Sequence, residues 1–157
     1  TGAIHKNIRE VDEIFAISHV IAKEFTNMGV GFTIIEDMTL KDTIRYLNTR
    51  MTKADIAIEI HKDSFETKDS KRVGMYIDMS GKLSRQISDE FLKVFLTSGA
   101  SKDSWVRSYT ERNLALVRDV RFPSIIAEFG HVADENCIND RAFYGVNFCK
   151  IFHKIKV

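Results

Sequence analysis

The chain has 157 residues, a length that suits one compact domain with a single hydrophobic core. Its composition, 44% hydrophobic and 29% charged, is that of an ordinary globular protein. The formal net charge of +1 gives no bulk attraction to nucleic acid or to an anionic membrane surface, and no apolar run approaches the roughly 20 residues of a membrane span.

The first part of the chain predicts a loop, a helix and a strand. Residues 1–8 are expected to be a loop, and a helical pattern follows, with Asn7 as its candidate N-cap and Gly29 as its end. Glu10 falls in the first helical turn. There the helix dipole favours a carboxylate, but the side chain could also project towards a strand end. The next residues, 30–35, are expected to form a short strand. The predicted inward face of the helix comprises Val11, Ile14, Phe15, Ser18, Ile21, Ala22 and Phe25.

The rest of the chain alternates between strand and helix patterns. Strands are expected at residues 54–63, 72–78 and 123–130, and helices at residues 40–51, 80–96 and 138–155. The segments between them are a polar loop at 64–71, an irregular stretch at 99–112 and a short apolar run at 114–117. This alternation predicts an α/β fold, a three-layer sandwich with a twisted, mostly parallel sheet and helices on both faces.

Two of the predicted strands carry a reactive side chain near their carboxyl ends. His61 follows the alternating run A-D-I-A-I-E-I, and Glu128 follows P-S-I-I-A. In open α/β sheets, binding groups collect just outside the carboxyl ends of strands. A lone histidine in such a place is usually a hydrogen-bonded structural residue. Two strands of the same design instead suggest two walls of one site.

Glu10, His61 and Glu128 are the residues that we expect to meet. A catalytic zinc takes three protein ligands of the histidine and carboxylate kind and keeps one position open for water. His61 and Glu10 are the candidate metal ligands, and Glu128 is the candidate catalytic residue, a general base and acid outside the coordination shell. The sequence contains no H-E-x-x-H, no G-x-S-x-G and no glycine-rich phosphate loop that would indicate another chemistry.

Four stretches also carry a family resemblance. R-E-V-D-E-I-F-A is similar to a motif lkEkdlnLa, and A-D-I-A-I-E-I-H-K-D, after T-L-K-D-T-I-R-Y-L-N-T-R, is similar to AD-x-x-iSiHaN. R-V-G-M-Y-I is similar to a strand G-x-e-x-y-y, and P-S-I-I-A-E-F-G-H-V-A-D-E-N is similar to PavLvE-x-GFlsN. These motifs belong to the zinc-dependent N-acetylmuramoyl-L-alanine amidases of bacterial autolysins and phage endolysins, which the chain resembles over nearly its whole length.

The resemblance implies a function for each candidate residue. Residues 1–157 would be a single amidase-like catalytic domain, in which Glu10 and His61 bind Zn²⁺. Glu128 would activate the attacking water and then protonate the L-alanine nitrogen as the stem peptide leaves. The implied partner is bacterial peptidoglycan, with no nucleic acid and no membrane span. The implied place of action is the bacterial cell wall. The absence of a recognisable signal peptide favours a phage lysin, and a secreted enzyme is the alternative if Thr1 is a trimmed end.

The sequence departs from the family pattern in ways that leave alternatives open. The family's opening strand and the first zinc histidine in the turn after it are absent from this sequence, as expected either of a trimmed chain or of a divergent member, and His5 and His131 are the candidate substitutes. Asp63 and Asp134 replace two family asparagines, which alters the charge around the site. A non-catalytic peptidoglycan-binding module with a degenerate metal site is therefore the alternative function, and a zinc exopeptidase is a third. The candidate groove-lining residues are Phe65, Trp105, Arg107 and Arg118.

Overall fold

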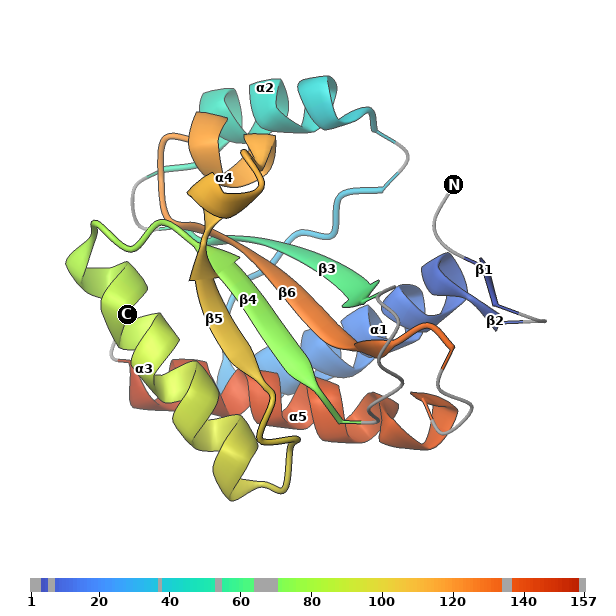
Figure 1. The fold of residues 1–157 in the computed structure, drawn as a ribbon. Coiled ribbons are helices and arrows are strands. Elements are labelled where there is room, and N and C mark those ends of the chain that lie inside the picture. The colour runs from blue at the N-terminus through green and yellow to red at the C-terminus, as the bar shows by residue number, and fades with distance from the viewer. Residues whose placement is uncertain are drawn as a thin grey trace.

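The chain folds around a four-stranded sheet (Figure 1). The computed structural model describes residues 4–5, 8–36, 38–52, 55–63, 71–133 and 137–155. The strands lie in the order β3 (Ala57–Asp63), β6 (Ser124–His131), β4 (Val73–Ile77) and β5 (Trp105–Ser108). The pairs β3–β6 and β4–β5 are parallel, and the pair β4–β6 is antiparallel. The sheet is therefore mixed, with two of its three pairings parallel.

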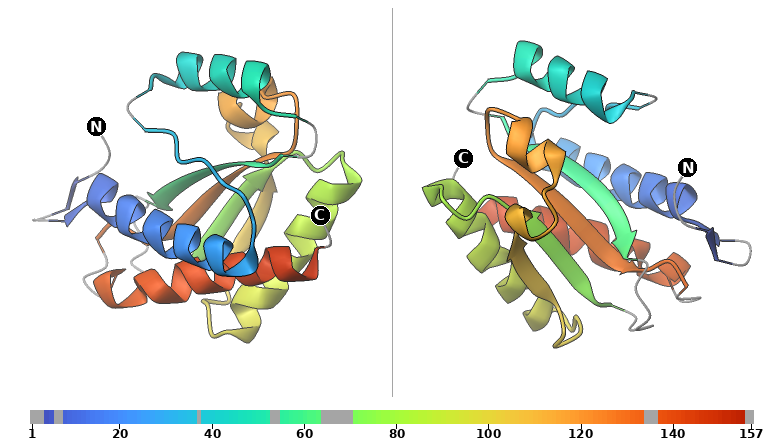
Figure 2. Two further views of the ribbon diagram at one scale, coloured as in Figure 1. Left: turned by 180° about the vertical axis from the view of Figure 1, so that it is seen from behind. Right: turned by 45° about the horizontal axis from the view of Figure 1, so that its top comes forward.

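Helices cover both faces of this sheet, which gives the expected three-layer α/β sandwich (Figure 2). On one face α1 (Glu10–Met28) and α5 (Cys137–Lys154) lie side by side, and α3 (Lys82–Thr97) packs against α5. On the other face lie α2 (Leu40–Arg50) and the short α4 (Ala115–Asp119). Among the described helices, none combines the length and the apolar character that crossing a lipid bilayer requires.

Side-chain alternation along the strands divides the core between the two faces. Successive residues of a strand point to opposite sides of the sheet. Met75, Ala127 and Phe129 therefore join α1, α3 and α5 in one cluster. Tyr76 and Ile126 join α2 and α4 in the other cluster. Both central strands, β4 and β6, are thus buried on two sides. This fixes their register, because a slip of one residue would move every side chain of the strand to the opposite face of the sheet.

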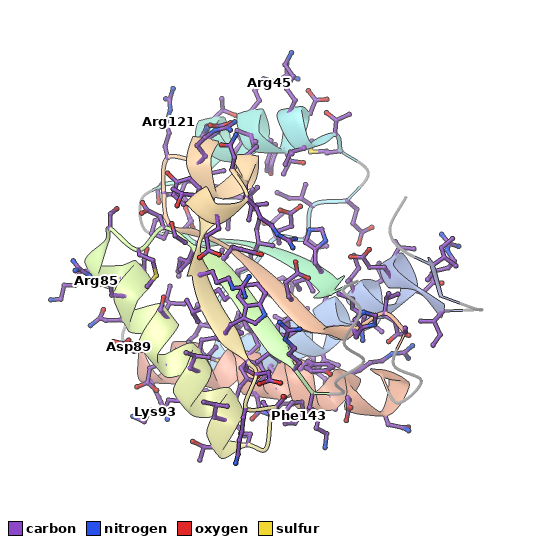
Figure 3. All side chains as sticks on the ribbon, viewed as in Figure 1. Arg45, Arg85, Asp89, Lys93, Arg121 and Phe143 are labelled. Atoms are coloured by element: carbon purple, nitrogen blue, oxygen red, sulfur yellow. The ribbon has the colours of Figure 1, made fainter. Side chains whose placement is uncertain are left out.

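The predicted long helices are confirmed, with boundaries close to those expected. Helix α1 ends at Gly29, which adopts a left-handed conformation with φ 70° and donates its N–H to the last turn. Helix α2 starts after Thr39, whose hydroxyl accepts the N–H of Asp42 at 3.2 Å. Helix α3 presents its polar side to solvent, as Arg85, Asp89 and Lys93 show in Figure 3.

The inward face of α1 differs from the prediction. Val11 and Phe15, predicted to be core residues, are 41% and 50% exposed. Ile21 and Phe25 are buried as predicted, and the helix also buries Glu10, Glu13 and Ile17. Glu13 accepts two hydrogen bonds from the guanidinium of Arg141 on α5, on the side of α1 that packs in the core.

Three predictions about short segments are wrong. The start of the chain contains two paired strands, β1 (Ile4–His5) and β2 (Ile8–Arg9), and Arg9 stands at the N-cap position, while Asn7 lies outside the described residues. Residues 30–35 are not a strand, because no described strand lies beside them to form a ladder. The stretch 99–112 is not wholly irregular, since it contains β5 and a 3₁₀ turn, η1 (Tyr109–Glu111).

Gly74 on β4 is a position where only hydrogen fits. A Cβ built there would lie 2.2 Å from Cζ2 of the Trp105 indole on the next strand. Gly74→Ala is therefore expected to displace Trp105 and to lower the free energy of unfolding by about 1–3 kcal/mol. Urea denaturation measures this loss. Gly31→Ala, where an added Cβ meets no atom within 4 Å, is the control. A Gly74→Ala protein as stable as this control would contradict the packing described here.

Candidate active site

The pairing of β3 with β6 brings two of the predicted site residues together. His61 lies directly opposite Glu128 in the parallel ladder, and both point to the face covered by α2 and α4. Neither residue ends its strand, because β3 continues to Asp63 and β6 to His131. Glu128 is the single residue of β6 that is only partly buried. A carboxylate that interrupts an otherwise buried strand needs contact with water or with a cation.

Glu10 reaches the same place from α1. Its side chain is 11% exposed, and its Oε1 lies 3.1 Å from Nδ1 of His61. The same oxygen accepts the backbone N–H of Lys62 at 3.2 Å. Helix α1 begins at Glu10, so the carboxylate also lies at the positive end of the helix dipole. The first turn of α1 thus fixes Glu10 against the end of β3.

Glu59 is a fourth member of the group, which the sequence did not single out. It precedes His61 by two residues on the same strand and therefore shares its face of the sheet. Its Oε1 lies 3.2 Å from Nε2 of His61. In the alternating sequence of β3, Glu59 looks like an ordinary polar position. Only its spacing of two from a candidate histidine could have singled it out.

The carboxylates around His61 raise the pKa of its imidazole to about 9. The largest cause is the hydrogen bond to Glu59, and partial burial of the ring acts in the opposite direction. The charges of Glu59 and Glu128 and the hydrogen bond to Glu10 raise the pKa further. The imidazole of the metal-free protein is therefore protonated at neutral pH.

These residues border a pocket of about 360 Å³. Arg112, Tyr76, Leu114, Ala115 and Leu116 also line this pocket. The guanidinium carbon of Arg112 lies 5.6 Å from the centre of the Tyr76 ring, and that ring is 2% exposed. A cationic side chain thus lies over an aromatic ring in the lining of the pocket that the carboxylates border. The sequence missed Arg112 because it lies in a stretch without periodicity.

The described candidates for the substrate groove, Trp105, Arg107 and Arg118, do not line this pocket. Trp105 packs on Gly74 and meets the Tyr76 ring edge-on at 4.7 Å. Arg107 lies over the Trp105 ring at 4.7 Å. Arg118 donates hydrogen bonds to Asp119 and to Oδ1 of Asn113. Phe65 lies outside the described residues. The described members of this set thus make structural contacts.

The two substitute histidines are not part of the described cluster. His5 lies on β1, and its side chain is outside the described residues. His131 pairs with Asp63, beyond a register shift that follows the His61–Glu128 pair, and its Nδ1 accepts the N–H of Ala133 at 2.9 Å. The side chain of Asp63 and the whole of Asp134 lie outside the described residues.

The donors at His61 are of the right kind for zinc. Imidazole nitrogen and carboxylate oxygen are both common zinc donors, and the negative charge gathered around the ring favours a divalent cation. Within the described part of the chain, however, no group of three or more His, Cys, Asp or Glu side chains has the geometry to hold a metal ion. His61 and Glu10 therefore fit as a partial ligand set.

Removing the Glu59 carboxylate should lower the pKa of His61. In metal-free Glu59→Gln protein we expect this pKa to fall from about 9 towards the ordinary value of 6.5, as measured by NMR titration of the ring in the presence of a chelator. Because folding raises this pKa, charged His61 stabilises the metal-free fold below pH 6.5, and that contribution is lost as the pH rises through about 9.

Glu24→Gln is the matched control for this titration. Glu24 lies on the same helix as Glu10 but about 21 Å further along its axis. The control protein should keep the raised pKa of His61. A wild-type His61 that titrates near 6.5 would contradict the geometry of the site.

Comparison with known proteins gives a family match and a set of similar structures. The family model described as N-acetylmuramoyl-L-alanine amidase matches residues 1–144. No protein of curated function matches the chain. Among solved structures, the N-acetylmuramoyl-L-alanine amidase AmiC2 of Nostoc punctiforme is similar with a TM-score of 0.70 and 20% identity, over 98% of this chain and 86% of that one.

Two further structures show the same fold. The N-acetylmuramoyl-L-alanine amidase from Clostridium difficile 630 has a TM-score of 0.74 and 14% identity, over 100% of this chain and 90% of that one. The catalytic domain of the CD27L endolysin, which targets Clostridia difficile, has a TM-score of 0.71 and 12% identity, over 98% of this chain and 88% of that one. At such low sequence identities, the similarity to these structures shows the fold alone.

Proposed function

The chain belongs to the N-acetylmuramoyl-L-alanine amidase family, and on that premise we propose that residues 1–157 form one zinc-dependent catalytic domain acting at the bacterial cell wall. Its reaction is hydrolysis of the amide bond between N-acetylmuramic acid and the L-alanine of the stem peptide in peptidoglycan. The observation that carries the assignment of the site is the pairing of His61 with Glu128 across β3 and β6, with Glu10 in contact with His61.

Glu128 is the general base and acid of the proposed reaction. It borders the pocket from a rigid, buried strand, so its carboxylate is held in one place with one side open. As a base it takes a proton from the attacking water. It then returns the proton to the L-alanine nitrogen, which leaves as an amine while the lactyl group becomes a carboxylate. Glu128 thus acts both when water attacks and when the amine leaves, and no covalent intermediate with the chain is needed.

His61 and Glu10 are the proposed zinc ligands of this chain. Zinc, when bound, supplies Lewis-acid chemistry at the scissile carbonyl. Three protein ligands are usual at a catalytic zinc, and this pair supplies two of them. Contacts that already fix Glu10, from the backbone of Lys62 and from the ring of His61, support a preorganised pair.

Glu128→Gln should abolish hydrolysis while leaving metal binding intact. The variant keeps the size of the side chain but cannot exchange a proton, so kcat is expected to fall by at least about 100-fold. The measurement is release of L-alanine amino termini from purified peptidoglycan, with zinc content determined on the same samples. Glu111→Gln, at an exposed position paired with Arg107, is the control. A Glu128→Gln protein with more than a tenth of the wild-type rate would disprove this assignment.

His61→Ala should remove bound zinc. Wild-type protein dialysed against Zn²⁺ is expected to hold about one ion per chain, and the variant is expected to hold none, because one of its few donors is lost. Elemental analysis measures the ratio. His19→Ala, which removes an exposed histidine of α1, should leave the ratio unchanged.

The alternative function is a non-catalytic peptidoglycan-binding module. The one observation in its favour is that the described residues contain no complete group of three metal donors. Wild-type protein that takes up no zinc at any pH, and that binds peptidoglycan without cleaving it, would establish this alternative. Release of amino acids from free peptides, without release of lactyl carboxylate from peptidoglycan, would indicate an exopeptidase instead.

A further inference from the structure

His61 is held between two carboxylates, one at each ring nitrogen. Nδ1 lies 3.1 Å from Oε1 of Glu10, and Nε2 lies 3.2 Å from Oε1 of Glu59. A neutral imidazole has one N–H donor and one lone pair. Only the nitrogen with the lone pair can bind a metal ion. The carboxylate that accepts the N–H therefore decides which side of the ring faces the metal.

The two carboxylates approach the ring in different ways. Glu59 and His61 are two residues apart on one strand, so their side chains stand side by side, in the geometry of a lateral hydrogen bond. Glu10 comes from another element, α1, and its carboxylate is anchored by the backbone N–H of Lys62. Ligands from two different elements can close around an ion. Glu10 and His61 come from α1 and β3, so an ion can lie between them beside Nδ1, with Glu59 left at Nε2.

We propose that Glu59 is a positioning residue that accepts the Nε2–H of His61, so that Nδ1 presents its lone pair to the metal beside Glu10. This inference rests on the proposed function. Glu59 stands where the family motif AD-x-x-iSiHaN has a serine, so the carboxylate is a feature of this chain. A carboxylate at the far nitrogen fixes the ring orientation and makes the ligating nitrogen more electron-rich.

The first test identifies the metal-bound nitrogen directly. Long-range ¹H–¹⁵N NMR spectra of zinc-loaded wild-type protein distinguish a protonated ring nitrogen from a metal-bound one. The expected spectrum has Nε2 of His61 protonated and Nδ1 bound to zinc. Zinc at Nε2 would overturn the proposal. Because this test uses the wild-type chain, it does not depend on whether any variant folds.

The second test measures zinc affinity by competition with a chelator. Glu59→Ala should weaken binding by about 10–100-fold, the usual effect of losing a partner of a ligating histidine. Glu59→Gln should recover part of that loss, because its amide oxygen still accepts the Nε2–H. Glu24→Gln is the control and should bind as the wild type does. Unchanged affinity in Glu59→Ala, or no recovery in Glu59→Gln, would overturn the proposal.

Neither readout depends on hydrolysis, so the two proposals can fail separately. A chain that binds zinc through Nδ1 without cleaving peptidoglycan disproves the proposed function and supports the role of Glu59. A chain that cleaves peptidoglycan with zinc at Nε2 disproves only the role of Glu59. A chain that binds no zinc disproves both.

Discussion

The parallel register between β3 and β6 is the constraint on which the site depends. It places His61 beside Glu128, and a slip of one residue would send one of them to the opposite face. The register is fixed by the core, because Ile125, Ala127 and Phe129 are buried under α1, α3 and α5. Packing on one face of the sheet thus holds the reactive pair in place on the other face.

The fold places several carboxylates around the imidazole of His61, and their negative charge determines what this ring can bind. Glu10, Glu59 and Glu128 come from α1, β3 and β6 and act on the same ring. Like charges so close to one another need a compensating cation. In the metal-free protein a proton on His61 provides it. Under the proposed function, zinc replaces this proton when it binds to His61. The same carboxylates therefore strengthen the binding of zinc and the binding of the proton that competes with it.

Local sequence patterns predicted the long helices and strands. They failed for short segments, where pairing with another strand decides whether a strand forms. Helices α1, α3 and α5 carry enough helical turns for their periodicity to be read, and β3 and β6 are distinct apolar runs. Strand β5, W-V-R-S, has no apolar pattern of its own and exists because it pairs with β4. Residues 30–35 have a strand-like pattern but no described neighbour to pair with. Val11 and Phe15 are exposed because α1 turns Ile17 and Ile21 into the core, and Glu13 meets Arg141 of α5 on the same side, a tertiary contact that no local pattern reveals.

The same distinction applies to the site. Glu10, His61 and Glu128 could be chosen from a helix start, from two apolar strands and from family motifs, whereas Glu59 and Arg112 needed the geometry of the sheet and of the pocket. The most direct measurement of the central claim is an anomalous diffraction map, from crystals grown with Zn²⁺, collected on both sides of the zinc absorption edge. The account predicts a peak within coordination distance of His61 and Glu10, on the side of the sheet that carries Glu128. A peak elsewhere on the molecule, with none at His61, would contradict it.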